Sequence, residues 1–297
     1  MISTPKLPIG DVMETVIDWM TKNLSGLFKV IKNGLEGIIG NVSDLLSAIP
    51  FLLFLVLIVF LAWWRIGKGF AVFTGIGLFL IYNLQLWNHA MITLALVLTA
   101  TLIALIIGLP LGILMAKKST ADKIIRPILD FMQTMPAFVY LIPAVYFFDL
   151  GVVPGAVATI IFAMPPIVRL TNLGIRQVPT DVVEATKSFG ATPSQLLFKV
   201  QFPLAVPTIM AGLNQTIMLA LSMVVISAMI GAEGLGKTVY EGITQMRLGK
   251  GFEGGLAVVI VAMLLDRITQ SLGKTQHKSG KVFFQNWRNK RKKIRQK

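Results

Sequence analysis

Residues Ala90–Ala116 have the sequence AMITLALVLTATLIALIIGLPLGILMA and contain no charged side chain. A helix needs about 20 consecutive apolar residues to cross the hydrocarbon core of a bilayer, and this stretch exceeds that length. A second charge-free stretch, Ala205–Ile230, has the same character. The two segments predict a membrane protein whose spanning elements are helices.

The composition of the whole chain agrees with this prediction. Its 297 residues are 55% hydrophobic and 14% charged, whereas soluble domains carry about 25% charged residues. The chain has no cysteine and two histidines, which excludes a disulfide framework, a thiolate metal site, a cysteine nucleophile and a His-rich metal centre. In a soluble protein the net charge of +14 would indicate binding to nucleic acid. Here the distribution of the charge decides its meaning.

Apolar stretches of suitable length recur along the chain and predict an all-α polytopic membrane protein with about seven transmembrane helices. The predicted spans are Leu46–Trp64, Gly67–Trp87, Ala90–Ala116, Phe131–Phe148, Leu150–Val168, Ala205–Ile230 and Gly254–Leu272. In the last of these, the weakest, we expect Asp266 to pair with Arg267 near the headgroups.

The segment that precedes the spans, Val12–Leu46, has apolar residues at every third or fourth position. This spacing is typical of amphipathic helix. We expect the segment to lie in the membrane interface and to be split by Gly26, Gly34, Gly37 and Gly40. A helix that packs on a soluble partner is the alternative.

The distribution of lysine and arginine predicts the orientation of the chain. With seven spans, 21 of these residues fall on one side of the membrane and 7 on the other, or 10 against 7 without the C-terminal tail. Because cytoplasmic loops carry the excess of positive charge, the N-terminus is predicted outside the cell and the C-terminus in the cytoplasm.

One sequence motif suggests a nucleotide site but lies in the wrong context. Gly231–Thr238 matches the phosphate-loop pattern G-x-x-x-x-G-K-[ST]. A phosphate loop joins a buried strand to a helix and needs a further acidic residue for magnesium. Here the motif ends a predicted span on the outer side, so we interpret it as an irregular outer loop.

No other catalytic constellation is present, and no ionisable residue lies near the middle of a predicted span. Ion-coupled carriers commonly place such residues within their spans. A stand-alone ion- or proton-coupled carrier is therefore disfavoured. A membrane enzyme that acts on lipid is disfavoured because acid and base residues do not converge. Energy is expected to enter from another subunit.

The longest inner loop, residues 178–203, is the predicted point of entry for that energy. Asp181 and Glu184 have the spacing of a capping box, and Val182, Ala185, Thr186 and Phe189 are predicted to share one helix face. Gly190 fits the left-handed position that ends a helix, and Thr192 with Gln195 predicts a second capping box. Two short helices should therefore meet at a fixed bend.

The same loop resembles a known family. Glu184-Ala185-Thr186, Gly190 and Val200-Gln-Phe-Pro203 resemble the E-A-A…G…I-x-L-P loop of permeases of type I ABC importers, with departures at Thr186, Val200 and Phe202. The resemblance covers about Ala90–Leu272. Within the family, Met132–Tyr140 (MQTMPAFVY) and Ala220–Ile226 (ALSMVVI) are similar to glycine betaine/proline betaine permeases of osmoprotectant importers, as is the amphipathic extension.

This resemblance implies a division of the chain into four parts: an N-terminal segment (1–45), two peripheral helices (46–88), a type I permease domain (89–272) with the coupling loop 178–203, and a basic cytoplasmic tail (273–297). It also implies that the loop docks on a separate ATPase, which binds ATP and Mg. The residues assigned to this coupling are Glu184, Ala185, Thr186, Phe189, Gly190, Ala191, Thr192 and Pro203.

The resemblance further implies a solute-binding protein, a second permease copy in a homodimer, and no catalytic, metal or cofactor site in this chain. The expected cargo is glycine betaine or a related quaternary ammonium solute, with choline, carnitine or an amino acid as alternatives. Aromatic faces attract such cations, so Phe138, Tyr140, Tyr146 and Phe147 are candidates for the translocation path.

The C-terminal tail is strongly basic. Residues 278–297 carry nine lysines and arginines and no acid. Such clusters next to a membrane bind anionic lipid at about 1 kcal/mol per charge. The predicted lipid contacts are Lys290, Arg291, Lys292, Lys293 and Arg295, and a simple positive-inside anchor is the alternative. A role for the tail in binding nucleic acid has little support.

Overall fold

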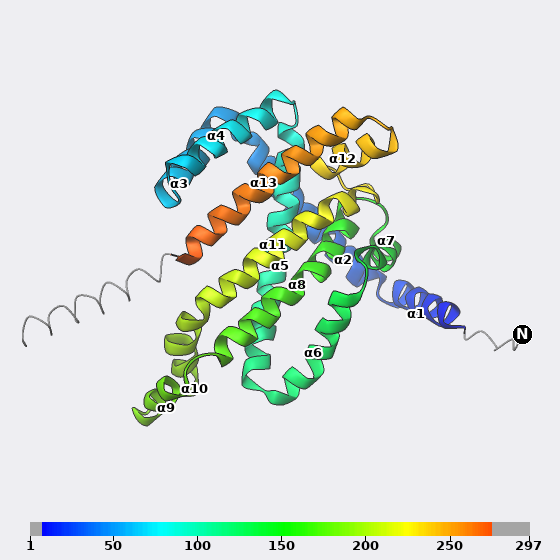
Figure 1. The fold of residues 1–297 in the computed structure, drawn as a ribbon. Helices are drawn as coiled ribbons and strands as arrows, with labels where there is room; N and C mark the ends of the chain where they lie inside the picture. Colours follow the sequence, from blue (N-terminus) through cyan, green and yellow to red (C-terminus); the bar gives the residue numbers. More distant parts are fainter. Residues whose placement is uncertain (1–7, 275–297) are drawn as a thin grey trace, which may run out of the picture.

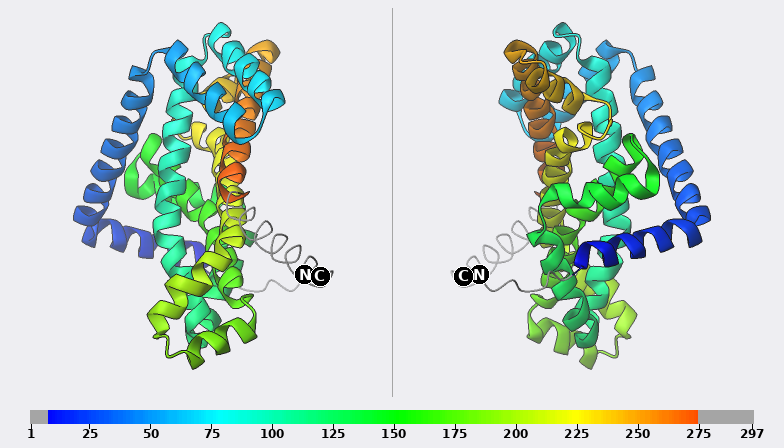
Figure 2. Two further views of the ribbon diagram at one scale, coloured as in Figure 1. Left: turned by 90° about the vertical axis from the view of Figure 1, so that its left-hand side faces the viewer. Right: turned by 90° about the vertical axis from the view of Figure 1, so that its right-hand side faces the viewer.

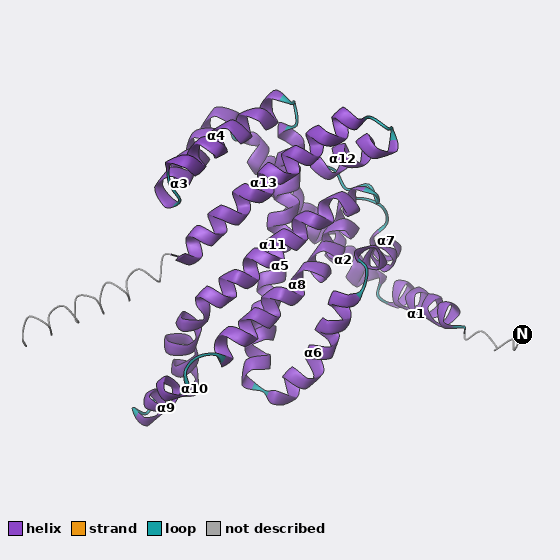
Figure 3. Cartoon of the chain, in the orientation of Figure 1, coloured by secondary structure: helices purple, strands orange, loops and turns teal. Residues whose placement is uncertain are grey.

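The structure is a computed structural model that describes residues 8–274. Over these residues it contains helices and no strand (Figure 3), which confirms the all-α prediction. The elements are α1 (Ile9–Asn23), α2 (Ser25–Ala48), α3 (Phe51–Arg65), α4 (Lys68–Asn83), α5 (Trp87–Lys117), α6 (Ser119–Thr134), the 3₁₀ turn η1 (Ala137–Tyr140), α7 (Leu141–Phe148), α8 (Val152–Arg176), α9 (Thr180–Ser188), α10 (Pro193–Gln195), the π-helical segment η2 (Leu196–Gln201), α11 (Phe202–Ala228), α12 (Leu235–Thr244) and α13 (Leu248–Lys274).

Helices α5, α8 and α11 pack against one another and form the centre of the molecule (Figure 1). Glycines set the approach of α5 to α8. A Cβ placed on Gly108 would lie 2.5 Å from Ile167 Cγ2, and one placed on Gly112 would lie 2.6 Å from Thr171 Cβ. Glycines spaced four residues apart let two membrane helices approach closely, so these two positions are where α5 and α8 meet.

The predicted spans correspond to helices of unequal length. Helices α5 and α8, the continuous helical run Pro193–Ala228, and Leu248–Ser271 of α13 are long and apolar enough to cross a membrane. Helices α3 and α4 are shorter and pack together as a hairpin. With each bent pair of helices taken as one span, residues 8–274 hold up to six spans, against the seven predicted.

The predicted span Phe131–Phe148 is not one straight helix. The segment turns by 109° between α6 and η1–α7. Met135 has an extended backbone with ψ 133° and precedes Pro136, and a residue before proline is driven out of the helical region. An apolar stretch that contains proline can therefore fold back instead of crossing directly.

The N-terminal helices differ from the prediction in where they break. The break lies at Leu24, between α1 and α2, whereas Gly26, Gly34, Gly37 and Gly40 all lie inside α2. Helix α2 packs on α5, α7 and α8, and buries Leu35 and Ile39. Because most helix stability in proteins comes from such packing, it offsets the cost of about 1 kcal/mol for each interior glycine.

The phosphate-loop motif begins in the connection between α11 and α12 and ends within α12. Gly231 and Gly234 have φ values of +93° and +113°, and the N–H of Leu235 donates a hydrogen bond of 2.8 Å to Thr93 Oγ1 on α5. The motif therefore lacks the preceding strand of a phosphate loop. Its first half, residues 231–234, is an irregular loop as interpreted, whereas its second half, residues 235–238, forms the first turn of α12.

The pair expected between Asp266 and Arg267 is wrong. Gln270 Nε2 donates to both carboxylate oxygens of Asp266, at 2.8 Å each. Residues four apart on a helix are neighbours, whereas adjacent residues do not face each other. Asp266 therefore pairs with Gln270, one turn further along α13.

The two extremes of the molecule are formed by different elements. Helices α9 and α10 lie at one extreme, and α12 lies at the other (Figures 1 and 2). The long helices α8 and α11 run from one of these regions to the other. A force on α9 and α10 would therefore act on the adjoining ends of α8 and α11.

Candidate functional site

The coupling loop begins where α8 ends at Arg176, four residues before α9. Val178 is buried, and Pro179 precedes the first residue of α9, Thr180. The capping box predicted at Asp181 and Glu184 is wrong, because no side chain caps α9 and both residues lie within the helix. Pro179 itself occupies the N-cap position of α9. Its ring fixes the backbone angle φ there without a capping side chain.

The bend after α9 is built on Gly190, whose φ is +78°. The N–H of Gly190 donates to the carbonyl of Lys187 at 2.9 Å, and that of Ala191 donates to the carbonyl of Thr186 at 3.3 Å. These bonds satisfy carbonyls at the end of α9 in the manner of a glycine-terminated helix. The predicted left-handed glycine is therefore confirmed.

The second half of the bend is fixed by Thr192 and Gln195. The N–H of Gln195 donates to Thr192 Oγ1 at 3.3 Å, and the N–H of Thr192 donates to Gln195 Oε1 at 3.0 Å. Pro193 occupies the first helical position, where its missing N–H costs nothing. The predicted capping box is confirmed, and the bend is held from both sides.

The side chains around this bend face away from the rest of the chain. Phe189 is 91% exposed, and Glu184, Ala185, Gly190, Thr192 and Pro203 are exposed as well. Thr186 is half-buried and donates to the carbonyl of Val182 at 2.7 Å, and Ala191 is also half-buried. Val182, Ala185 and Thr186, three of the four residues predicted to share a helix face, lie within α9, whereas Phe189 is the residue directly after its end.

The loop is connected rigidly to the core through a feature that sequence analysis missed. Residues Leu196–Gln201 form a π-helical segment between α10 and α11, and Pro193–Ala228 is one continuous helical run. Leu196 and Leu197 are buried, and Leu197 packs in the cluster that holds Ile167 and Ala205. No residue pattern distinguishes a π-helical turn from an α-helical one, so this segment could not be predicted from the sequence.

A polar cluster at the same end of the molecule was also missed. Asp122 of α6 accepts hydrogen bonds from Arg126 at 2.8 Å and from Asn172 at 3.1 Å, and lies 3.4 Å from Arg176. Arg176 also donates to the carbonyl of Met115 at 2.7 Å. The cluster ties α5 and α6 to the end of α8, next to the coupling loop. Only the spacing of Asp122 and Arg126 could have been noticed in the sequence.

Three members of this cluster, Arg126, Asn172 and Arg176, line a cavity of about 380 Å³. The ion pair between Asp130 and Arg169 lines the same cavity. A second cavity, of about 290 Å³, lies near the opposite end between α2 and the start of α8. At its edge Lys32 of α2 pairs with Asp149 at 2.6 Å. The two cavities lie toward opposite ends of α8, which packs in the centre of the bundle.

The four aromatic residues predicted for the translocation path do not share one surface. Tyr140 is buried, and its hydroxyl donates to the carbonyl of Met132 across the bend between α6 and α7. Phe147 stacks on Phe28 of α2, with ring centroids 4.4 Å apart. Phe138 and Tyr146 are exposed. Two of the four therefore hold helices together, and two face outward.

Comparison with known proteins gives the family of this chain. Residues 108–277 match the family described as the binding-protein-dependent transport system inner membrane component. The chain belongs to this family. It is therefore a multi-pass bacterial membrane protein that serves as the permease subunit of a transport system, and it is not an enzyme.

Individual relatives match over nearly the whole chain. The chain is 53% identical to the glycine betaine transport system permease protein OpuAB of Bacillus subtilis, over 93% of this chain and 97% of that protein. It is 54% identical to the glycine betaine/carnitine transport permease protein GbuB of Listeria monocytogenes, over 92% and 98%. It is 49% identical to the glycine betaine/proline betaine permease protein ProW of Escherichia coli, over 92% and 77%.

The solved inward-facing structures of the MetNI methionine ABC transporter share the fold. One of them superposes with a TM-score of 0.56 at 22% identity, over 65% of this chain and 95% of that chain. The predicted type I importer fold is thus confirmed. The predicted lipid contacts in the tail, Lys290 to Arg295, lie outside the described residues.

Proposed function

We propose that this chain is the membrane-spanning permease of an ATP-driven importer of glycine betaine or related quaternary ammonium solutes. The support is the identity of about half of all residues to relatives named for glycine betaine transport. Because one of these relatives is also named for carnitine, carnitine is the second candidate cargo, ahead of choline or an amino acid. The separate binding protein is expected to select among them.

The observation that carries the coupling mechanism is the exposed bend around Gly190 on a rigid base. An ATPase subunit that binds ATP and Mg would grip Phe189 and its neighbours. Leu196 and Leu197 fix the far side of the bend in the core, so a push on the bend moves α11 and α8 together. The permease then exchanges between two conformations whose populations the partners shift through their differential affinity.

The complete transporter in this proposal contains two copies of the permease, two ATPases and a solute-binding protein. The N-terminus lies outside, and the coupling loop and C-terminus lie in the cytoplasm. The basic tail binds anionic lipid. Of the aromatic candidates, Phe138 and Tyr146 are exposed and remain available to a cationic cargo, whereas Tyr140 and Phe147 already pack inside this chain.

The coupling proposal is tested by the pair Gly190→Asp and Gly190→Asn. Both residues tolerate the left-handed backbone better than other side chains do, and a Cβ at this position meets nothing within 4 Å. The two variants should therefore insert and unfold alike. We expect Gly190→Asp, which adds a charge to the contact, to lose ATPase co-purification at least tenfold, and Gly190→Asn to lose less.

Normal co-purification of the ATPase with Gly190→Asp would contradict the assignment of the coupling loop. Uptake in proteoliposomes tests the wider proposal. Radiolabelled glycine betaine should accumulate only when the permease, the ATPase, the binding protein and ATP are all present. Uphill uptake by this chain alone, driven by a proton or sodium gradient, would favour an ion-coupled carrier instead.

A further inference from the structure

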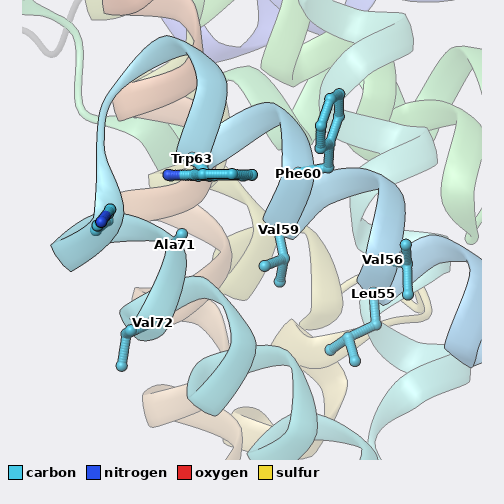
Figure 4. A pocket seen from close by; sticks show the side chains of 8 residues that line it. Leu55, Val56, Val59, Phe60, Trp63, Ala71 and Val72 are labelled. Carbon is cyan, nitrogen blue, oxygen red and sulfur yellow. The ribbon is translucent and has the colours of Figure 1, made fainter.

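A groove runs between α3 and α4, on the peripheral hairpin and away from the coupling loop. Its volume is about 470 Å³, within the range of small-molecule sites. Leu55 and Val59 of α3 and Ala71 of α4 are half-buried or buried and form its floor, while Phe60 and Trp63 are exposed and form one wall. Figure 4 shows these side chains projecting from the two helices.

The lining is apolar apart from one residue, Lys68, at the first position of α4. Lys68 is exposed, and none of the ion pairs found within residues 8–274 includes it. Arg65 lies three residues earlier in the same turn, and residues 51–83 contain no aspartate or glutamate. The hairpin therefore combines an apolar channel with the positive charge of Lys68 at one end, and residues 51–83 supply no acid to pair with Lys68.

We propose that this groove is a binding site for an anionic phospholipid, with an acyl chain along Leu55, Val59 and Ala71 and the phosphate at Lys68. An acyl chain gains by filling a concave apolar surface, because more of its area is in contact there than on a convex helix face. An exposed ammonium group attracts an anionic headgroup, and a tryptophan beside it suits the region where headgroups meet acyl chains.

The charge decides between a lipid and a second copy of the chain. The same hairpin on a second copy would bring Lys68 and Arg65 toward like charges, since the hairpin has no acid to offer in return. An anionic lipid supplies both the apolar chain and the negative charge. The site is separate from the basic tail, and it does not depend on which solute is transported.

The test uses phosphatidylglycerol with brominated acyl chains, because bromine quenches a nearby tryptophan. Purified permease in nanodiscs of phosphatidylcholine should show a saturable quenched component as brominated phosphatidylglycerol is added, and Trp63→Phe should remove it. Brominated phosphatidylcholine should need about fivefold more lipid for the same quenching, as expected for the loss of one favourable charge contact.

Two matched pairs of variants separate the contributions of charge and shape. Lys68→Gln should abolish the fivefold preference, whereas Lys118→Gln, at an exposed lysine between α5 and α6, should leave it unchanged. Val56→Phe fills the groove and should remove the saturable component, whereas Ile76→Phe changes an exposed residue outside the groove lining and should not.

Equal quenching by both lipids in the unaltered protein would overturn the proposal, as would a preference that survives Lys68→Gln. The chain has no cysteine, so Val56→Cys gives a single thiol. Efficient disulfide cross-linking of that thiol in nanodiscs holding two copies, with no saturable quenching, would show that a second copy covers the groove, and would also overturn the proposal.

Discussion

The contact between α5 and α8 and the coupling loop each depend on a glycine, but for different physical reasons. At Gly112 the backbone is helical, and a Cβ would lie 2.6 Å from both Thr171 Cβ and the carbonyl oxygen of Val168. At Gly190 a Cβ would meet nothing within 4 Å, but φ is +78°. The first glycine is required by its neighbours and the second by its own backbone.

This difference separates stability from coupling. A side chain at position 112 must push α8 away from α5, and so alters the core in which both helices lie. A side chain at position 190 leaves the core as it is and changes only what a partner meets. Variants at position 112 should therefore fail in assays of stability, and variants at position 190 in assays of partner binding.

The largest effect is expected for Gly112→Ala. Overpacking of a close contact costs about 1–3 kcal/mol, and we expect the upper end because one of the atoms in the way belongs to the backbone. The measurement is the free energy of unfolding from a denaturant titration in detergent micelles. In the control Gly255→Ala, on α13 with nothing within 4 Å, alanine should stabilise by about 0.5–1 kcal/mol. Equal effects of the two variants would refute the steric explanation.

Asp122→Ala should follow, with a loss of about 2 kcal/mol in the same titration. The substitution leaves Asn172, Arg126 and Arg176 without the carboxylate that they share, and an unsatisfied buried donor costs about 1–3 kcal/mol. Arg126→Gln is the control, because Asn172 and Arg176 still contact Asp122. If Arg126→Gln costs as much as Asp122→Ala, the cluster does not act through Asp122.

Thr192→Ala should cost about 1 kcal/mol, the usual value for loss of a helix cap. The loss is local, so it should appear as faster hydrogen exchange of the amides of residues 194–197 with little change in the global unfolding midpoint. Thr192→Ser keeps the hydroxyl and should retain slow exchange. Fast exchange in both variants would mean that the methyl group, and not the cap, holds the bend.

The smallest effect concerns pH and the pair Glu241–Lys250, which joins α12 to α13 at 2.5 Å. The hydrogen bond from Lys250 lowers the pKa of Glu241 below its ordinary value of 4.5, and the charges of Lys250, Lys237 and His89 lower it further. A lowered folded-state pKa gives stability that is present above the ordinary pKa and lost as pH falls through the folded-state value.

Lys250→Gln should therefore reduce stability slightly at pH 7 and make the loss of stability below about pH 4.5 less steep. Because both side chains are partly exposed, the change should be a few tenths of a kcal/mol. The comparison is made by unfolding titrations at pH 7, 5 and 4. An identical slope in the variant and the unaltered protein would show that Glu241 titrates without help from Lys250.

The local features around Gly190 were predictable from the sequence, although the equally local capping box at Asp181 and Glu184 did not form. Long-range contacts were not predictable. Gly190, Thr192 and Gln195 were assigned correctly because caps and turns involve residues two to four apart. The bond of Arg176 to the carbonyl of Met115 joins residues 61 positions apart, and no pattern in one sequence relates such positions. The same limit applies to Tyr140, whose hydroxyl donates to the carbonyl of Met132 on the other side of the bend, a contact that no sequence pattern indicated.

The sequence by itself determined that this chain is helical, that it belongs in a membrane, and that a capped bend lies near residue 190. These properties follow from the length of the apolar stretches and from hydrogen bonds between residues close in sequence. Both depend on the segment itself and not on its neighbours in the fold. Tertiary structure decided the continuity of α2 through four glycines and the polar cluster at Asp122. Each of these depends on which helix lies alongside, because packing energy between segments outweighs the preference of either segment alone.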